Sequence, residues 1–208
     1  MTTNRRAILS LTLLGAPVAA IARKSGTLCH PLFGQLTFET VDNDWVRGGD
    51  IRFTAGFEKS VIKPLFIPQI VGMPRSAEGA VNTGNIQFHA DAHAQLLTAF
   101  EQIEKQGLLP KMVSFGGARF QPRLSKPVDG EGKRLLSRTP SNHSFGTAFD
   151  VNARDGKYGA TARPFVAIFE ANGFEWGQAF NDPMHFQVKK FLGSQAAPTS
   201  TCAIREPK

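Results

Sequence analysis

Two short segments bring together residue types that bind metal ions. The first, SNHSFGTAFDVN at 141–152, holds His143 and Asp150, and the second, NDPMHFQ at 181–187, holds His185. Two imidazoles and a carboxylate form a ligand set that zinc accepts, and three protein ligands leave a fourth position for the water that a catalytic zinc ion needs. We therefore predict one zinc ion per chain, bound by His143, Asp150 and His185.

The residues around these ligands suit a hydrolytic site. Gly146 permits a sharp turn after the first ligand, and Ala148 leaves the strand face beside Asp150 uncluttered. Asp182 lies three residues before His185. We expect that Asp182 binds no metal and acts as the general base that takes a proton from the metal-activated water.

A second histidine pair competes as a metal site. The segment HADAH at 89–93 places His89 and His93 four residues apart, which on a helix puts both side chains on one face. The zincin pattern requires Glu after the first His, and this chain has Ala90 there. We therefore interpret the pair as part of a helix surface or a cleft wall. His30, in a segment that reads as a linker, is expected to be exposed to solvent.

Ser141 offers a different chemistry, because a serine nucleophile needs a nearby histidine. Ser141 lies two residues before His143, and residues two apart on a strand face the same way. The G-x-S-x-G turn that presents a nucleophilic serine is absent from the sequence. We interpret Ser141 instead as a residue that orients a ligand by a hydrogen bond.

Strands must position most of these residues. Alternating polarity predicts strands at 35–40 and 50–57, and the ligand-bearing segments TAFDVN and PMHFQVKKF also read as strands. Residues 63–74 are apolar but contain three prolines, which favours an extended segment over a helix. Residues 111–120 read as a strand that breaks at its paired glycines. The charged, Pro- and Gly-rich residues 121–140 predict a long exposed loop.

Two helices complete the predicted fold. The first begins near Phe88 and ends at Gly107, with an apolar stripe formed by Leu96, Leu97, Phe100 and Ile103. The second spans 162–174, with Pro164 in its first turn and Gly173 just past its end. Helices interspersed with short alternating strands predict a single α+β domain, with a small, mainly antiparallel sheet and flanking helices.

The combined pattern S-x-H-x-x-G-x-A-x-D followed by D-x-x-H-F resembles a known family of bacterial and phage zinc peptidases. That family includes VanY-type D-alanyl-D-alanine carboxypeptidases and L-alanyl-D-glutamate endopeptidases. The segment GFEWGQAF, which contains Trp176, is similar to the family's Gly-Phe-x-Trp-Gly segment. The resemblance implies a Hedgehog/DD-peptidase-like fold, zinc binding by His143, Asp150 and His185, and Asp182 as the general base.

The resemblance also implies an arginine, upstream of the first motif, that polarises the scissile carbonyl. The segment GGARFQPR matches best with Arg123, and Arg119 and Arg138 are its rivals. Ser141, Arg138 and Trp176 are the predicted substrate-binding residues. Trp176 either lines the substrate groove or fills the core beneath it.

These implications predict a zinc peptidase that acts on peptidoglycan stem peptides, which are its expected partner. Many family members have Glu at the position of Asp182, and Asp occurs in the endopeptidase branch, so we expect cleavage of the L-Ala–D-Glu bond. The alternatives are a D-alanyl-D-alanine carboxypeptidase and a non-catalytic cell-wall-binding module on the same scaffold.

The N-terminus has the layout of a bacterial export signal. Arg5 and Arg6 precede an apolar run, and an A-x-A cleavage site ends at Ala22. The segment NRRAIL partly resembles a twin-arginine signal. We therefore expect residues 1–22 to be an export signal and the protein to be periplasmic or associated with the cell wall, with no membrane span after processing. A linker at 23–34, a peptidase domain at 35–192 and a flexible tail at 193–208 follow.

The formal net charge of +7 suits an acidic wall polymer. The sequence holds no run of five Lys or Arg and no nucleic-acid motif, so we expect no nucleic-acid partner, and we expect a monomer. Cys29 and Cys202 lie near opposite ends of the chain. They either pair in an oxidising compartment or remain free thiols.

Overall fold

The computed structural model describes residues 23–42, 44–75, 79–127, 129, 131, 133, 135–155, 159–193 and 202. These residues form three antiparallel sheets and two α-helices, which confirms the predicted α+β class. The first sheet contains β1 (Ser25–His30), β2 (Gly34–Thr40) and β3 (Ile51–Ala55), and the second contains β4 (Ile62–Phe66) and β5 (Asn85–His89). The third has the order β6-β7-β9-β8, from β6 (Phe115–Gly116), β7 (Ala148–Val151), β9 (His185–Val188) and β8 (Phe174–Trp176).

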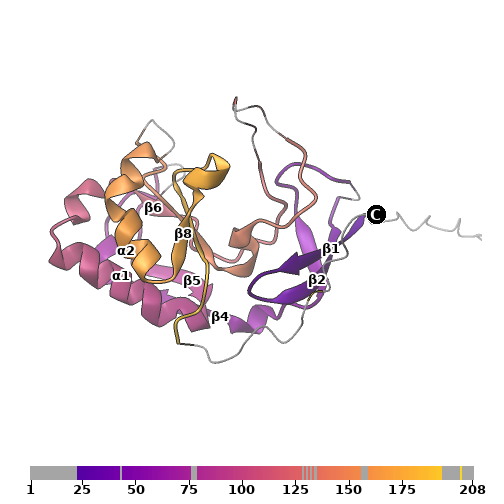
Figure 1. The fold of residues 1–208 in the computed structure, drawn as a ribbon, viewed down its shortest axis with the longest axis horizontal. Helices are drawn as coiled ribbons and strands as arrows, with labels where there is room; N and C mark the ends of the chain where they lie inside the picture. Colours follow the sequence, from indigo (N-terminus) through magenta and orange to yellow (C-terminus); the bar gives the residue numbers. More distant parts are fainter. Residues whose placement is uncertain are drawn as a thin grey trace, which may run out of the picture.

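Phenylalanines fill the core between the third sheet and the helices α1 (His93–Lys105) and α2 (Val166–Ala171). Phe149 of β7 is fully buried at the centre of this core, where it contacts the rings of Phe115, Phe169 and Phe186. Figure 1 shows both helices at one end of the molecule and β1 and β2 at the other. The sheet that carries the predicted ligands lies between them.

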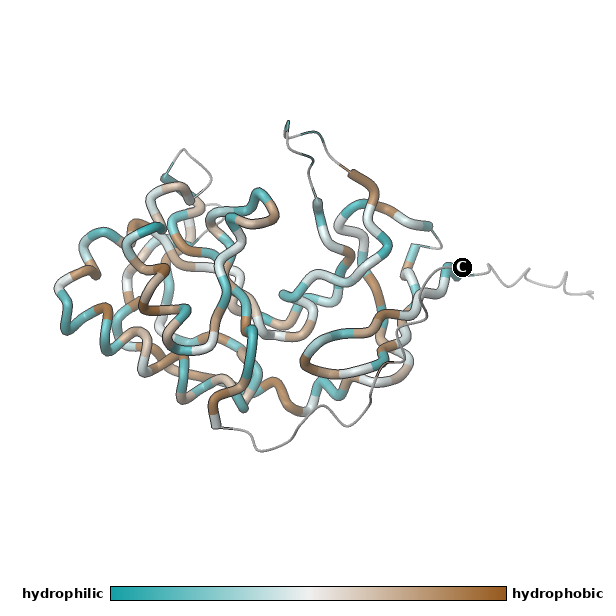
Figure 2. The backbone as a smooth tube through the Cα atoms, viewed as in Figure 1, coloured by the Kyte–Doolittle hydropathy of each residue, from teal (hydrophilic) through white to brown (hydrophobic). Residues whose placement is uncertain are grey.

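Helix α1 confirms the predicted apolar stripe but begins later than expected. Leu96, Phe100 and Ile103 are fully buried, and hydrophobic and hydrophilic residues alternate along the helix in Figure 2. Gly107, with a φ of 68°, lies just past the end of the helix as predicted. The predicted start near Phe88 is wrong, because Phe88 belongs to β5. Ile86 and Phe88 are buried with the period of two that a strand gives.

The predicted linker at 23–34 is also wrong, because residues 25–30 form β1. This strand pairs with β2 along its whole length, from Ser25 opposite Glu39 to His30 opposite Gly34. Its sequence, SGTLCH, has a weak apolar pattern, so the partner strand and the contacts beyond it decide the conformation.

Aromatic contacts join this first sheet to the core. Phe145 lies 4.6 Å from His30, 5.3 Å from Phe33 and 5.1 Å from Phe53, measured between ring centroids. His30 is only 8% exposed, so the expectation that it faces solvent is wrong. The rings of Phe33 and Phe145 bury it against the segment that carries the first predicted ligand.

The segment 121–140 is not exposed throughout, contrary to the prediction. Arg123 forms a β-bridge with Asp50, and Leu124 forms one with Pro140. Leu124 is fully buried and packs with Phe38 and Ile51 in a small second core. These contacts anchor the beginning of the segment beside β3.

Several predictions about the chain ends fall outside the described residues. The export signal at 1–22 lies wholly outside them, as does the tail at 193–208 apart from Gly193 and Cys202. Among the residues described, no helix combines the length and the apolar character needed to cross a membrane.

A disulfide bond joins Cys29 of β1 to Cys202, with their Cα atoms 5.9 Å apart. It closes a loop with a sequence separation of 173 residues. We predict that Cys29→Ser lowers the free energy of unfolding by about 2–5 kcal/mol, because the unfolded chain regains the entropy that the cross-link removes. Urea denaturation with and without reductant measures this loss. Cys202→Ser should give the same loss and the double variant no more, whereas full stability in either single variant would contradict the prediction.

Candidate metal centre

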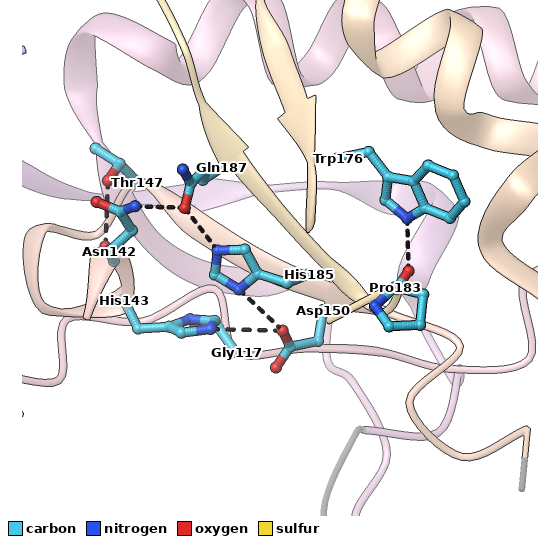
Figure 3. A network of polar contacts seen from close by, with 9 residues as sticks. All are labelled: Gly117, Asn142, His143, Thr147, Asp150, Trp176, Pro183, His185 and Gln187. Atoms are coloured by element: carbon cyan, nitrogen blue, oxygen red, sulfur yellow. Dashed lines mark hydrogen bonds and ion pairs between the residues drawn. The ribbon is translucent and has the colours of Figure 1, made fainter. Parts of the chain in front are cut away.

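The structure brings His143, Asp150 and His185 into one group. Each offers one ligand atom, and these atoms lie within 4.8 Å of one another. Nε2 of His143 is 3.4 Å from Oδ1 of Asp150, and Nδ1 of His185 is 3.6 Å from the same oxygen (Figure 3). The three side chains are therefore positioned to bind a metal ion, and their nitrogen and oxygen donors fit the preference of zinc.

The register of the third sheet creates this proximity. Asp150 on β7 lies directly opposite His185 on β9 and opposite Gly116 on β6. His143 comes from the 3-10 helix η5 (Asn142–Phe145), which ends at Gly146 with a φ of 62°. This left-handed residue turns the chain from η5 towards β7, as the sequence predicted.

Gly117 holds the first histidine in place, a role that the sequence analysis did not identify. The backbone oxygen of Gly117 accepts a hydrogen bond from Nδ1 of His143 at 2.9 Å, which leaves Nε2 free to face Asp150. A Cβ atom at Gly117 would lie 2.7 Å from the His143 ring and 2.8 Å from the Asp150 carboxylate. The pair Gly116-Gly117 at the end of β6 was the signal in the sequence, because only glycine permits this close approach.

Burial and the neighbouring polar groups act in opposite directions on the pKa values of Asp150 and His185. Burial alone would raise the pKa of Asp150, but the charges and hydrogen bonds of His143 and His185 outweigh burial and hold that pKa far below its usual range. Burial would likewise lower the pKa of His185, yet its bond to Asp150 raises it. Asp150 is therefore an ionised carboxylate that attracts a cation.

Asp182 lies beside this group on the turn between the 3-10 helix η7 (Gly177–Phe180) and β9. Its backbone N–H donates to Gly177, and its carbonyl accepts from the N–H of His185, both at 3.0 Å. A Cβ atom at Gly177 would lie 2.3 Å from the Asp182 carbonyl oxygen, so the turn requires glycine there. Burial raises the pKa of the Asp182 carboxyl, and the nearby charge of His185 opposes this rise.

Arg123 is half-buried near the group. Burial lowers the pKa of its guanidinium, and the neighbouring Asp150 and Asp182 carboxylates oppose that effect. Its Nε is buried and makes no hydrogen bond within the described part of the chain. An unpaired buried donor close to the ligand group is available to an oxygen atom of a bound molecule.

The serines of the first motif fix the backbone of Arg123. The N–H of Ser141 donates to the Arg123 carbonyl at 2.9 Å, and the Ser144 hydroxyl both donates to this carbonyl and accepts from the Arg123 N–H. Ser141 thus lies next to the ligands, and its backbone acts on Arg123. The predicted hydrogen bond from its side chain to a ligand, and its role in substrate binding, stay predictions.

The two rival arginines lie in different surroundings. Arg119 is exposed, and its charge contributes to lowering the pKa of Arg123. Arg138 is also exposed and lies over the ring of Trp45, 5.8 Å from its centroid. The charges of Asp150 and Asp182 act on Arg123, which therefore lies close to the ligand group. The substrate-binding role of Arg138 stays a prediction.

Trp176 at the end of β8 packs against the main core and supports the turn that carries Asp182. Its indole N–H donates to the carbonyl of Pro183 at 2.6 Å (Figure 3). The guanidinium of Arg163 lies 5.2 Å from the centroid of its ring. These contacts agree with the core position considered for Trp176, while a contact with substrate stays a prediction.

The competing histidine pair does not lie on a single helix. His89 ends β5 and stacks on Phe191 at 4.7 Å, whereas His93 begins α1 and its Nε2 lies 3.1 Å from the Phe88 carbonyl oxygen. Because the two imidazoles belong to different elements, they do not share the helix face that the spacing suggested.

Polar residues behind His185 were also missed by the sequence analysis. Nε2 of His185 lies 2.9 Å from Oε1 of Gln187, which also contacts Asn142 (Figure 3). The Gln187 amide in turn contacts Glu175 on β8. Local spacing carries no signal for these contacts, since Asn142 and Glu175 come from segments far from Gln187 in the sequence.

A comparison with known families agrees with this geometry. The family model described as D-alanyl-D-alanine carboxypeptidase matches residues 136–188, about a quarter of the chain, and this part holds all three ligands and Asp182. No curated protein and no solved structure matches the chain. The match covers the same residues that converge on the metal centre, and it supports the resemblance of the chain to a family of zinc metallopeptidases.

Proposed function

We propose that this protein is a zinc-dependent peptidase that hydrolyses an amide bond in peptidoglycan stem peptides. One observation supports this most directly: the His143–Asp150–His185 group is flanked by a carboxyl group whose pKa is raised, Asp182, and by an arginine with an unpaired buried Nε, Arg123. A metal site that is only structural needs neither of these groups. Amide hydrolysis needs both a proton acceptor and a donor to the developing oxyanion.

The residues divide the reaction between them. Zinc bound at the centre supplies Lewis-acid polarisation of the carbonyl and lowers the pKa of a water molecule. Asp182 takes the proton of the attacking water and then delivers it to the nitrogen of the leaving amine. Arg123 donates its unpaired Nε–H to the carbonyl oxygen as negative charge develops there.

Two stem-peptide bonds are candidates. In D-Ala–D-Ala and in L-Ala–D-Glu, a D-residue with a free α-carboxylate follows the scissile amide, so one cationic or hydroxyl-lined pocket serves both. The matching family, D-alanyl-D-alanine carboxypeptidase, favours D-Ala–D-Ala. The aspartate at position 182 and the GFEWG segment favour L-Ala–D-Glu through the resemblance to the endopeptidase branch. An endopeptidase must also leave the far side of this pocket open for the continuing chain.

We propose that the protein acts outside the cytoplasm, in the periplasm or at the cell wall. The Cys29–Cys202 disulfide supports this location, because disulfides persist in oxidising compartments. The export-signal layout of residues 1–22 and the family's cell-wall substrates support it as well.

We predict that His143→Ala and His185→Ala each lose most of the bound zinc, because each variant removes one of three ligands. Elemental analysis after dialysis should find one zinc ion per wild-type chain. His89→Ala is the control and should keep its zinc, since His89 stacks on Phe191 and does not belong to the ligand group. Bound zinc should fall with decreasing pH, because protons compete with the metal for the imidazole nitrogens, and the raised pKa of His185 places the onset above the usual histidine range. Full zinc content in both ligand variants would contradict the assignment.

We predict that Asp182→Asn keeps its zinc but hydrolyses substrate about 10²–10⁴-fold more slowly, which is the usual scale of general acid–base catalysis. Because burial raises the pKa of Asp182, the base is protonated at a higher pH than an ordinary aspartate. The wild-type rate should therefore fall with decreasing pH above the usual carboxyl range, with the zinc content measured at each point. Asp91→Asn, on the exposed surface, is the control. Near-normal turnover in Asp182→Asn would remove Asp182 from the mechanism.

We predict that digestion of purified sacculi by the wild type releases new amino-terminal Glu with little free D-Ala, as cleavage of L-Ala–D-Glu requires. End-group labelling and chromatography of free amino acids measure both products. Abundant D-Ala without new Glu termini would assign the carboxypeptidase activity instead. Wall binding without either product, in a zinc-loaded sample, would indicate the non-catalytic binding module.

A further inference from the structure

We propose that Gln187 is a positioning residue that fixes the proton of His185 on Nε2 and so directs Nδ1 at the metal. The inference rests on the metal centre of the proposed function, and it does not depend on which stem-peptide bond is cleaved. It follows from a chain of hydrogen bonds in which each donor and acceptor can be assigned.

The assignment begins at Glu175, because a carboxylate only accepts hydrogen bonds. Glu175 lies directly opposite Gln187 in the β8–β9 pair, and its Oε1 contacts Nε2 of Gln187. The amide nitrogen of Gln187 must therefore face Glu175, and its Oε1 must face the other way. That oxygen points at Nε2 of His185, 2.9 Å away. Since an amide oxygen only accepts, Nε2 of His185 must donate to it, and Nδ1, 3.6 Å from Oδ1 of Asp150, is the nitrogen that faces the ligand group.

A second donor to the same oxygen continues the chain. Nδ2 of Asn142 donates to Oε1 of Gln187, so Oδ1 of Asn142 is an acceptor. Nε2 of His30 lies 2.9 Å from this oxygen and must donate, while Nδ1 of His30 accepts from the N–H of Leu32 at 3.1 Å. Each hydrogen bond in this network has only one possible direction, because reversing either amide would place two donors or two acceptors together.

The sheet register leaves room for this arrangement. Ala148 on β7 lies opposite Gln187, as Asp150 lies opposite His185 two residues further on. These two pairs therefore occupy the same face of the sheet. The small side chain of Ala148 leaves the space beside Gln187 to Asn142, whose backbone carbonyl accepts from Thr147. These hydrogen bonds therefore lie directly behind His185, one of the predicted metal ligands.

We predict that Gln187→Leu weakens metal binding about 10–100-fold, the usual cost of losing a partner that orients a metal-binding histidine. Competition with a coloured chelator measures the affinity for zinc and needs no substrate. In the metal-free protein, long-range ¹H–¹⁵N spectra recorded at a pH above the raised pKa of His185 report its tautomer. The wild type should show Nε2–H, and Gln187→Leu should show a mixture of the two tautomers.

Glu175→Gln tests the same point with less change in side-chain volume. An amide at position 175 can donate as well as accept, so the Gln187 amide can turn over, and we expect a smaller loss of zinc affinity with partial mixing of the His185 tautomers. Glu170→Gln, an exposed neighbour on α2, is the matched control and should behave as the wild type. If Gln187→Leu fails to fold, Glu175→Gln decides.

Unchanged zinc affinity and an unchanged His185 tautomer in the folded variants would overturn the positioning role, even if the variants were less stable. Failure of the proposed function would look different. The wild type would then bind no zinc, while His185 would still show an Nε2–H tautomer that depends on Gln187.

Discussion

Asp150 and His185 lie directly opposite each other on β7 and β9, and the rest of the metal centre depends on this register. The neighbouring pair, Phe149 and Phe186, stacks at 5.7 Å on the other face, and both rings are fully buried. A slip of one residue in either strand would exchange the two faces, which would expose a phenylalanine and bury a carboxylate away from its imidazoles. The hydrophobic core and the metal centre therefore specify the same pairing, and each stabilises the other.

Close approach is the second requirement of this centre. The carboxylate of Asp150 is tolerated in a half-enclosed place because two imidazoles compensate its charge. They can do so only because the backbone at Gly117 and Gly177 lies closer to the groups of the site than a residue with a Cβ atom would allow. Behind the ligands, Gln187 and its partners replace water as hydrogen-bonding groups, so the imidazole orientation is set before any ligand binds.

The sequence predicts those parts of the site that depend on residue identity over short distances. His143 and Asp150 are separated by one turn and one strand, and Asp182 and His185 by one turn, so type and spacing were enough to find them. The stripe of α1 was found for the same reason. Phe88 was misassigned because a strand and a helix start follow each other without a break, and a short apolar run does not distinguish them. Strand β1 and the burial of His30 were missed because their partners, Phe145, Asn142 and Cys202, come more than a hundred residues later.

The distance in sequence between β1 and its partners determines when this strand can reach its final state. A chain is synthesised from its N-terminus, so β1 leaves the ribosome first, whereas Phe145 and Phe191, which pack on Phe33, leave late. Cys202 is the last of the described residues to be made. Contacts of such long range are slow to form, because the loop between them must first close. Among the described strands, β1 is therefore synthesised first but completes its packing last. Until then, the nascent chain exposes a free thiol at Cys29 and an uncovered aromatic surface.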